Sequence, residues 1–600
     1  MIKNFSYLDA IRPDAGWEVD MALVTSYSSD LVVLVATMLA LAGLDDERGS
    51  GSKVDFASAH ERLRNRVKFL VQAGRMTMPR TKPAVLGIMD RFIRNIRKDE
   101  KVSSWHPKVS LIRYTHSEQK LIQWRFWIGS RNLTRDCSWD IGVLLIGQSG
   151  KNGTNVSGIA DLGEILTELS RLTVLTPVVV RRELADLTWF SPEGIAVHYA
   201  EFRHDGRIAG LPTPPEDIEE LLVISPFIDG STIQQLGKWG RPGVKRVLLS
   251  SHAELAKLLD QKQKPTSGFE QLLFMDAPDP EDEGNDEDTA KPDEAETFLR
   301  GLHAKLICAK MSGSAKIWFG SANATVRGWG GANTEAIAEM DVDEKFYSHL
   351  REFVENGSIL KPDEVAIEPC DEREDLIEDA RKAITASWMA KLECLENVPI
   401  LTNPVPFKPD IPGIKLEIGL ITSDMVVCES EVKMLRLPPI APHQFTQLVA
   451  VRLSIEDIQS VWVEQAECDV NISPERDQRA LAHFLTPRVF LEWIRSLLDS
   501  GFTDEGGGDW AETSESKPRQ GIPSYASAPW WAPSLEEVLR AWSRNPDSLR
   551  DIDRRLKAYV KYLDEHQGND ATAEDLVVLL EFNDMWEVVR RELIRSRRHG

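Results

Sequence analysis

The chain has 600 residues, of which 42% are apolar and 28% are charged, with a formal charge of −23 at pH 7. This length exceeds what one compact core usually holds, so we expect two to four domains of ordinary globular composition. The charge alone would argue against a nucleic-acid ligand, whose phosphates repel an acidic protein. None of the six cysteines belongs to a C-x-x-C pair, which argues against a zinc ribbon or a disulfide framework.

We expect a cytoplasmic protein with free thiols that does not enter a membrane. The N-terminal segment lacks the basic, apolar and small-residue regions of a signal peptide. The longest apolar run, residues 31–44, is too short to span a bilayer and is typical of a buried segment where a strand leads into a helix. No amphipathic basic helix or long apolar loop suggests docking to a membrane surface.

The elements predicted first along the chain form a layered α/β unit. Residues 20–44 alternate and then run apolar, which predicts a strand that enters a helix. Residues 60–75 and 83–98 have apolar positions at helical spacing with arginines between them, which predicts two helices. Short strands are predicted next at 105–114, 120–130 and 141–147.

The pattern then restarts, which predicts that this unit is built twice. The second unit contains a helix-like segment at 232–240 and closes near Glu339. Its strands are predicted at 218–228, 244–251, 303–310 and 316–325. Strands that alternate with helices indicate an α/β fold, here with one half at 1–170 and the other at 171–360.

The chain changes character after the second unit. Residues 361–480 are expected to form a β-rich accessory domain. Apolar residues at helical spacing follow at 479–500 and 534–566, on either side of a polar linker at 504–521. We therefore expect 481–600 to be a helical C-terminal region, and no motif in either region indicates a chemical function.

Charge is distributed unevenly along the chain. Residues 61–135 carry 18 Lys and Arg against 5 Asp and Glu, so this block is strongly basic within an acidic protein. Residues 276–296 carry eleven acidic residues against one lysine, which predicts a flexible loop. The basic block could bind a phosphate backbone by counterion release, or it could be the solvated face of helices.

A histidine and a lysine two residues apart open two of the predicted strands. The first pair is His106 and Lys108 in WHPKVSLIRY, and the second is His303 and Lys305 in GLHAKLICAK. Because alternate side chains of a strand share a face, each pair projects together while its apolar neighbours face the opposite layer. A buried strand gains little from such a pair, so its repetition indicates a chemical role.

A small-residue turn with an amide follows each pair. The first turn, WIGSRNLT, contains Ser130 and Asn132, and the second, WFGSANAT, contains Ser321 and Asn323. The His-to-Asn separations of 26 and 20 residues suit a hairpin that returns the turn beside the histidine. The glycine of each turn permits a tight bend and close approach of a ligand, and the serine and asparagine supply hydrogen-bond donors.

Two such sets that face each other would suit a phosphate diester. One imidazole can attack phosphorus while the other protonates the leaving oxygen. Lysines and amides can hold the non-bridging oxygens and neutralise the charge that develops in the transition state. This chemistry needs no metal, and no cluster of Asp, Glu and His in the sequence indicates a metal or another cofactor.

These motifs resemble the H-x-K and G-S-x-N signature of the phospholipase D superfamily, in its two-copy, single-chain form. The superfamily includes phospholipases, phosphatidyl transferases, nucleases and tyrosyl-DNA phosphodiesterases. The resemblance covers residues 15–345 and implies a pseudo-two-fold, duplicated α-β-α core of the phospholipase D type. It also implies that the N-terminal histidine, His106, attacks phosphorus and that His303 acts as acid and base.

The match departs from the superfamily's fuller motif in one respect. That motif has an aspartate five residues after the lysine, where this chain has Arg113 and Lys310. Tyrosyl-DNA phosphodiesterases also lack this aspartate, so its absence does not imply inactivity. The departure weighs against the phospholipase and transferase branches.

In the superfamily, a carboxylate or amide after the G-S-x-N turn orients each histidine. Asp140 and Glu335 stand at comparable places here, and Asp136 competes with Asp140 for the first role. An orienting carboxylate would fix the tautomer of the imidazole and favour its protonated form. The predicted site is therefore His106, Lys108, Ser130, Asn132, Asp140, His303, Lys305, Ser321, Asn323 and Glu335.

Tryptophans surround both motifs, at positions 105, 124, 127, 139, 318 and 329. Exposed aromatic rings beside a basic groove are stacking platforms for single-stranded nucleic acid. Aromatic residues in strands also belong frequently to the core, so both interpretations stay open.

The sequence therefore predicts a metal-independent phosphodiesterase, most directly a nuclease that cleaves DNA through a phosphohistidine intermediate. The resemblance to bacterial members suggests DNA restriction or phage defence, with a helicase or another defence protein as partner. Three alternatives stay open, namely a phospholipase D-type lipid hydrolase, an end-processing phosphodiesterase for DNA adducts, and a catalytically idle, nucleic-acid-binding scaffold subunit.

Overall fold

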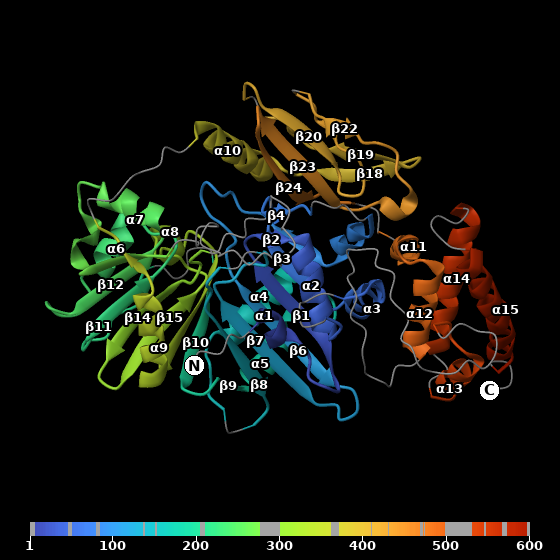
Figure 1. Cartoon of the computed structure of the whole chain (residues 1–600), viewed down its shortest axis with the longest axis horizontal. Coiled ribbons are helices and arrows are strands. Elements are labelled where there is room, and N and C mark those ends of the chain that lie inside the picture. The colour runs from blue at the N-terminus through green and yellow to red at the C-terminus, as the bar shows by residue number, and fades with distance from the viewer. Residues whose placement is uncertain are drawn as a thin grey trace, which may run out of the picture.

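The computed structural model (Figure 1) describes residues 6–45, 51–79, 84–135, 138–150, 153–204, 210–275, 301–361, 371–409, 411–429, 431–468, 472, 474–498, 531–544, 548–566 and 573–596. The predicted acidic loop at 276–296, the linker at 504–521 and Asp136 lie outside these residues. The described chain is a mixed α/β protein whose strands form four sheets. The predicted α/β class is thereby confirmed.

The first sheet has the strand order β5-β3-β1-β6-β7-β8-β9. Its strands are β1 (Trp17–Ser26), β3 (Val67–Gln72), β5 (Ile93–Ile96), β6 (Val109–His116), β7 (Ile122–Gly129), β8 (Gly142–Gln148) and β9 (Thr188–Phe190). Strands β1, β3 and β5 run parallel, whereas β6, β7 and β8 each run antiparallel to their neighbours. The C-terminal end of β1 therefore lies beside the beginning of β6.

The second sheet has the strand order β10-β16-β15-β14-β11-β12-β13-β17. Its strands are β10 (Ile195–Arg203), β11 (Glu220–Ile224), β12 (Lys245–Ser250), β13 (Gln271–Phe274), β14 (Leu306–Met311), β15 (Ser314–Gly320), β16 (Glu335–Val342) and β17 (Ser358–Ile359). From β13 through β11 to β16, the order and the strand directions match those from β5 through β1 to β8. The beginning of β14 consequently lies beside the end of β11.

Side chains from both sheets share one apolar core. Leu23 and Phe126 of the first sheet and Leu222 and Phe319 of the second belong to the same buried cluster. Helices α4 (Ile159–Ser170), α5 (Pro177–Ala185) and α9 (Glu344–Glu355) add apolar side chains to this cluster. Because burial of apolar area removes it from water, this common core holds the two sheets together.

The prediction for residues 20–44 is confirmed, whereas the helices predicted at 60–75 and 83–98 are wrong in part. After β1 the chain forms β2 (Ser29–Asp30) and α2 (Leu31–Ala42). The two wrong segments each end in a strand: α3 (Lys53–Leu63) precedes β3, and a 3-10 helix, η1 (Ala84–Arg91), precedes β5. Strand β3 lies between β1 and β5, and a strand buried on both faces has a continuous apolar run that resembles a buried helix.

The β-rich region shares a sheet with the first half. One of its two sheets has the order β18-β19-β22, and the other has the order β2-β4-β24-β23-β20-β21, in which β2 and β4 come from the first half. The strands are β4 (Met76–Thr77), β18 (Lys391–Leu395), β19 (Val398–Thr402), β20 (Lys415–Leu420), β21 (Val426–Val427), β22 (Met434–Arg436), β23 (Leu448–Ile455) and β24 (Ile458–Gln465). A helix, α10 (Glu372–Ser387), opens the region and lies near β2 and β4 in Figure 1.

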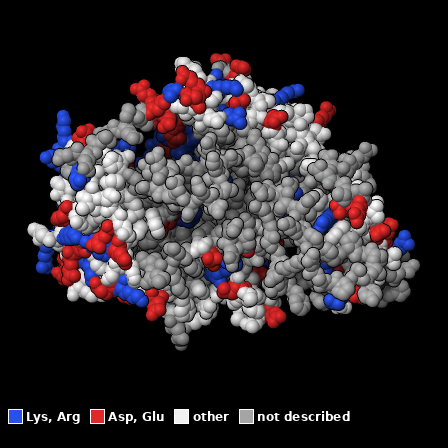
Figure 2. All heavy atoms as spheres, in the orientation of Figure 1, with Lys and Arg blue, Asp and Glu red and all other residues white. Residues whose placement is uncertain are grey.

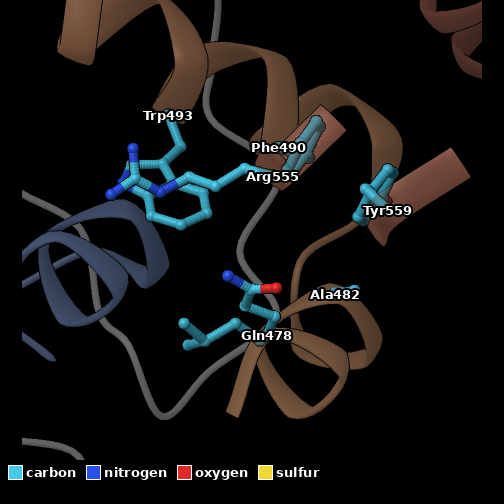
Figure 3. Close-up of a pocket in the computed structure, with 7 residues that line it drawn as sticks. Gln478, Ala482, Phe490, Trp493, Arg555 and Tyr559 are labelled. Atoms are coloured by element: carbon cyan, nitrogen blue, oxygen red, sulfur yellow. The ribbon is translucent and has the colours of Figure 1, made fainter. Parts of the chain in front are cut away.

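The C-terminal helices pack against α3 and η1 of the first half. They are α11 (Pro474–Phe484), α12 (Pro487–Leu498), α13 (Leu535–Arg544), α14 (Ser548–His566) and α15 (Ala573–Ser596). Leu39, Phe56, Leu491 and Trp586 are fully buried in one cluster. Figure 3 shows a small pocket among α11, α12 and α14, where the Arg555 guanidinium lies over the Trp493 ring. Among the described residues, no helix is both long and apolar enough to cross a membrane.

A buried ion pair joins α11 to the first half. The Arg476 guanidinium donates to both carboxylate oxygens of Asp90 in η1, at 2.9 Å and 2.8 Å. The side chains of Arg476 and Asp90 are only 5% and 1% exposed. Arg476 also donates to the buried Asp477 at 2.7 Å, and Arg91 pairs with the same carboxylate. Removal of Asp90 therefore leaves two arginines to share one counter-ion and is costly.

We expect Asp90→Ala to lower the free energy of unfolding by about 3–5 kcal/mol, measured by urea denaturation. The matched control is Asp217→Ala, which removes the partner of Arg241 from a pair whose side chains are 78% and 81% exposed. That exposed pair should contribute less than about 1 kcal/mol. Equal losses in the two variants would contradict a structural role for the buried pair.

Candidate active site

Both histidine–lysine pairs lie in extended segments that lead into a central strand. His106 and Lys108 precede β6, and His303 and Lys305 precede β14, so each strand begins one residue after the lysine. The prediction had placed the pairs inside the strands. Antiparallel pairing of β6 with β1, and of β14 with β11, brings both pairs to the edge where β1 and β11 end.

Short backbone pairings join each histidine segment to the other half of the chain. The His106 N–H donates to the Thr334 carbonyl at 2.9 Å, and the Thr334 N–H donates to the Ser104 carbonyl at 2.8 Å. The His303 N–H donates in the same way to the Trp139 carbonyl at 3.0 Å. Thr334 and Trp139 each come directly before an acidic residue, so these pairings fix where the two carboxylates lie.

Each histidine forms a hydrogen bond with the carboxylate of the other half. His106 Nδ1 lies 2.9 Å from Glu335 Oε2, and His303 Nδ1 lies 2.7 Å from Asp140 Oδ1. Because an ionised carboxylate can only accept, each Nδ1 carries the proton and each Nε2 is left for chemistry. The sequence predicted the two carboxylates as orienting groups but did not predict that they exchange partners between the halves.

The two serines of the G-S-x-N turns hold these carboxylates. Ser130 Oγ donates to Asp140 Oδ1 at 2.7 Å, and Ser321 Oγ donates to Glu335 Oε2. Each serine therefore binds the same oxygen that contacts the histidine. The expectation was that the serines would donate to a ligand, whereas here they fix the orienting groups.

The second oxygen of each carboxylate has a different partner in the two halves. Asp140 Oδ2 accepts from Arg131 at 3.3 Å, which is a charged donor. Glu335 Oε1 accepts from the amide of Asn333 at 3.2 Å, which is a neutral donor. The two histidine–carboxylate pairs are thus similar in geometry but unequal in their charged surroundings.

The turn glycines allow the next strand to approach closely. A Cβ atom added to Gly129 would lie 2.4 Å from the Ile141 carbonyl oxygen, and one added to Gly320 would lie 2.2 Å from the Ala336 carbonyl oxygen. Any other residue would push β8 or β16 away, together with the carboxylate at its start. The close approach that these glycines permit is therefore to backbone.

The two lysines are buried beside the histidines. Lys108 Nζ donates to the His106 carbonyl at 3.0 Å and lies 3.3 Å from His106 Nε2. Lys305 Nζ donates to the His303 carbonyl at 2.7 Å. Lys108 and Lys305 are 0% and 1% exposed, so two positive charges are held in the interior next to the imidazoles.

The turn asparagines have unused acceptor atoms. Asn132 Oδ1 and Asn323 Oδ1 are both buried, and neither has a hydrogen-bond partner among the described residues. A buried polar atom without a partner costs free energy, so it is a place where a bound molecule could supply the missing hydrogen bond.

Sequence analysis missed a pair of serines that hold the asparagine turns. Ser26 Oγ accepts from the Leu133 N–H at 3.0 Å, and Ser225 Oγ accepts from the Ala324 N–H at 2.9 Å. Each serine ends, or directly follows, a parallel central strand and precedes by four residues the aspartate that caps the next helix. This S-x-x-x-D repeat after a buried strand was the signal that could have identified them.

Burial dominates the proton affinities of the basic groups. It lowers the pKa of His303 to about 4, with the Lys305 charge acting in the same direction. It also lowers the pKa of His106, although the Glu335 carboxylate opposes this effect. The pKa of Lys108 falls to about 8, again through burial. These directions keep both imidazoles neutral near pH 7, which is the form that can act as nucleophile.

The two carboxylates behave in the opposite way. Burial favours the neutral form of Glu335, but the neighbouring His106 and Lys108 hold its pKa below the ordinary value. Burial acts likewise on Asp140, and the hydrogen bond and charge of His303 hold its pKa below the ordinary value. Both groups are therefore carboxylates at neutral pH and can fix the imidazole tautomers.

Two expectations about the surroundings of the site are changed by the structure. Five of the six tryptophans are buried, and only Trp139 is exposed, at 54%. Arg113 binds the carboxylates of Asp20 and Glu183, and Lys310 binds Glu344, so neither cation contacts a residue of the predicted site. The residues at the missing aspartate positions thus form ion pairs of the scaffold.

The arrangement can carry out acid, base and nucleophilic chemistry at one point. It supplies two imidazoles whose Nδ1 atoms are held by carboxylates, two ammonium groups and two amides from loops of both halves. Among the described residues, no three His, Cys, Asp or Glu side chains converge as metal ligands would. All ten residues predicted from the sequence lie in the two turns, the two extended segments, the segment just before β8 and the start of β16.

Comparisons with known proteins yield only distant likenesses. No protein-family model and no curated protein sequence matches the chain. A polyphosphate kinase from Porphyromonas gingivalis is 11% identical with a TM-score of 0.29, over 58% of this chain and 44% of that chain. A mutant of yeast tyrosyl-DNA phosphodiesterase 1 is 11% identical with a TM-score of 0.29, over 57% of this chain and 86% of that chain.

A phosphatidylserine synthase from Haemophilus influenzae is 10% identical with a TM-score of 0.29, over 63% of this chain and 91% of that chain. The chain spans less than half the length of the polyphosphate kinase that it matches. At these TM-scores the likenesses carry no argument about function, which rests on the geometry of the site.

The depressed pKa of His303 predicts a loss of stability in mild acid. The pKa of His303 is about 4 in the folded chain and 6.5 in its ordinary state. Between these pH values the unfolded chain therefore binds a proton that the folded chain does not. The free energy of unfolding should therefore decrease as the pH falls through that window. From pH 7.5 to pH 5 this group should account for roughly 2 kcal/mol, measured by urea denaturation.

The comparison variant is His303→Asn, whose amide can still donate to Asp140. It should lose less stability than the wild-type chain over the same pH interval, because asparagine does not titrate. An equal loss in both proteins would show that His303 has an ordinary pKa.

Proposed function

We propose that the chain is a metal-independent phosphodiesterase with a duplicated phospholipase D-type core, which cleaves DNA through a covalent phosphohistidine. The observation that carries the proposal is the crossed pairing of His106 with Glu335 and of His303 with Asp140, each beside a buried lysine. Two oriented imidazoles at one point supply a nucleophile and an acid without a cofactor. The matching strand order of the two sheets supports the duplication.

The first step transfers the phosphoryl group to the protein. His106 Nε2 attacks phosphorus and forms the P–N bond, while the bond from phosphorus to the leaving oxygen breaks. The negative charge of the bound phosphate diester raises the pKa of His303, so its Nε2 takes a proton from solvent when substrate binds and then gives that proton to the leaving oxygen. We assign the attack to His106 because the resemblance to the superfamily implies that the N-terminal histidine is the nucleophile, and its Nε2 lies 3.3 Å from Lys108 Nζ.

The second step returns the histidine. Neutral His303 accepts a proton from water as the water oxygen attacks phosphorus, and the P–N bond breaks to release His106 and the phosphate product. Lys108 and Lys305 neutralise the non-bridging oxygens in both steps, in a low-dielectric site where such charges act strongly. Asn132 and Asn323 complete the cradle from the two turns.

Nucleic acid is the proposed substrate because exposed cations and an exposed aromatic ring lie near the site. Arg75, Arg91 and Arg113 of the basic block are engaged in ion pairs. Arg131 and Arg135 beside the Asn132 turn also form ion pairs, with Asp140 and Asp30, but their side chains are 31% and 41% exposed and can approach a phosphate backbone. On the face shown in Figure 2, blue and red side chains are mixed over the described parts of the β-rich region and the second half.

The biological setting completes the proposal. A nuclease that works in the cytoplasm as part of a restriction or phage-defence system would act with a helicase or another defence protein. The β-rich region and the C-terminal helices, which carry no catalytic motif, are the parts proposed to contact such a partner.

Cleavage assays in EDTA test the proposal, with labelled single- and double-stranded DNA, plasmid and lipid substrates. DNA should be cleaved, and a protein–DNA adduct that is stable to alkali and labile to acid should be trapped by rapid quenching. His106→Ala should abolish the adduct. His303→Ala should lower the rate by about 10²–10⁴-fold, the usual contribution of general acid–base catalysis.

The matched control is His198→Ala. His198 also bonds to a carboxylate, Asp341, at 2.8 Å, but its side chain is 40% exposed and lies outside the site. This variant should keep wild-type activity. Loss of all cleavage in EDTA, or activity that survives both active-site substitutions, would overturn the mechanism, and cleavage of lipid alone would overturn the substrate.

A further inference from the structure

An aromatic side chain forms a wall against His106. Tyr27 follows β1 directly, and the centroid of its ring lies 4.9 Å from that of the His106 ring. Two cations lie over the same tyrosine: Arg75 Cζ is 5.2 Å from the ring centroid and Lys108 Nζ is 5.9 Å from it. Cations are attracted to the negative face of an aromatic ring. Arg75 and Lys108 therefore restrict the position of the Tyr27 ring, and the ring restricts theirs.

Among the described residues of the second half, no such wall lies beside His303. The chain position that follows the turn-holding serine is Tyr27 after Ser26 in the first half and Pro226 after Ser225 in the second. Within the described part of the chain, no aromatic ring contacts His303. The Tyr27 contact therefore distinguishes the two otherwise similar histidines.

His106 needs this wall because only one hydrogen bond holds its ring during attack. Glu335 anchors Nδ1, whereas the Lys108 Nζ that lies 3.3 Å from Nε2 gives up that contact when Nε2 attacks phosphorus. The single bond that remains allows the ring to swing about the line that joins the two groups. Packing against Tyr27 restricts that motion and keeps Nε2 directed at the reaction centre. Small errors in such a direction are costly, because attack requires near-ideal alignment of the reacting atoms.

The position of Tyr27 depends in turn on α10 of the β-rich region. Arg75 donates to Glu100 through Nε at 3.0 Å and through Nη2 at 2.5 Å, and the same Nη2 lies 2.5 Å from Glu378 of α10. The Glu100 carboxylate is almost fully buried, at 4% exposed. The position of the Arg75 guanidinium over Tyr27 therefore depends on a residue more than three hundred positions along the chain.

A second arginine, Arg381 of α10, binds the same Glu100 carboxylate. Arg381 is 3% exposed and donates to Glu100 at 2.7 Å and to the Gly74 carbonyl at 2.8 Å. Gly74 has a φ of +74°, and a Cβ atom there would lie 2.2 Å from Thr385 Oγ1. Helix α10 thus rests directly on the loop that carries Arg75, near the edge formed by β2 and β4 (Figure 1).

We propose that Tyr27 is a positioning residue for His106, and that α10 holds it in place through Arg75 and Arg381. The β-rich region, through α10, thereby sets the alignment of one catalytic histidine without contacting substrate. The kinetic part of this inference rests on the proposed phosphodiesterase function, whereas the placement of the His106 ring can be measured in the protein at rest.

The test combines histidine NMR with steady-state kinetics on DNA, using the full chain labelled at histidine Cε1. The His106 signal, assigned by its loss in His106→Asn, should carry a ring-current shift from Tyr27. That shift should disappear in Tyr27→Ala, change in Arg381→Met, and persist in Tyr27→Phe, which keeps the ring. Arg373→Ala is the control on α10, because Arg373 pairs with Asp371 and Glu456 away from this network.

In the kinetic arm, Tyr27→Ala should lower kcat by about 10–100-fold with little change in KM, as misalignment does. Arg381→Met should lower kcat in the same direction, and the double variant should lose less than the product of the two effects because both act on one ring. Tyr27→Phe should restore wild-type turnover.

Each outcome decides a separate point. A ring-current shift that is absent from the wild-type protein, or unchanged in Tyr27→Ala, would overturn the placement of Tyr27. A shift that responds to Tyr27 but not to Arg381 would overturn the role of α10. A full NMR response in a protein that cleaves no DNA would leave the positioning intact and overturn the proposed function instead.

Discussion

The rest of the site depends on the hydrogen bond between each histidine and a carboxylate of the other half. His106 cannot be oriented without Glu335, and His303 cannot be oriented without Asp140. Neither half can therefore complete the constellation that it begins. The common apolar core of the two sheets also makes the halves depend on each other, because it fixes the distance between them across which these hydrogen bonds form.

Burial gives this arrangement both its cost and its chemical value. Lys108, Lys305 and Glu335 are 0%, 1% and 0% exposed, and each buried ion loses several kcal/mol of hydration. Two ammonium groups and two carboxylates offset one another, while the serines and backbone carbonyls satisfy the remaining hydrogen bonds. The product is a fixed set of charges in a region of low dielectric, where the proposed substrate, a phosphate diester, would meet them without reorganisation of solvent.

The sequence indicated which residues lie together but not which of them pair with each other. The H-x-K pairs and the G-S-x-N turns are local patterns, so their eight histidines, lysines, serines and asparagines could be named from the sequence, whereas Asp140 and Glu335 were named from the resemblance to the superfamily. The exchange of carboxylates between the halves depends on how two sheets pack, which no local pattern records. Tyr27 was missed for the same reason, since only the fold brings it to His106. The helix expected at 60–75 was wrong where a strand buried between two others has no alternation to reveal it.

The central claim is that one site is assembled from both halves by exchanged carboxylates. It is tested most directly by NMR titration of the two histidines in Glu335→Gln and Asp140→Asn. Glu335→Gln should lower the pKa of His106 and leave that of His303 unchanged, because only His106 loses its adjacent negative charge, and Asp140→Asn should do the reverse. If each substitution instead shifted the histidine of its own half, the composite site described here would be contradicted.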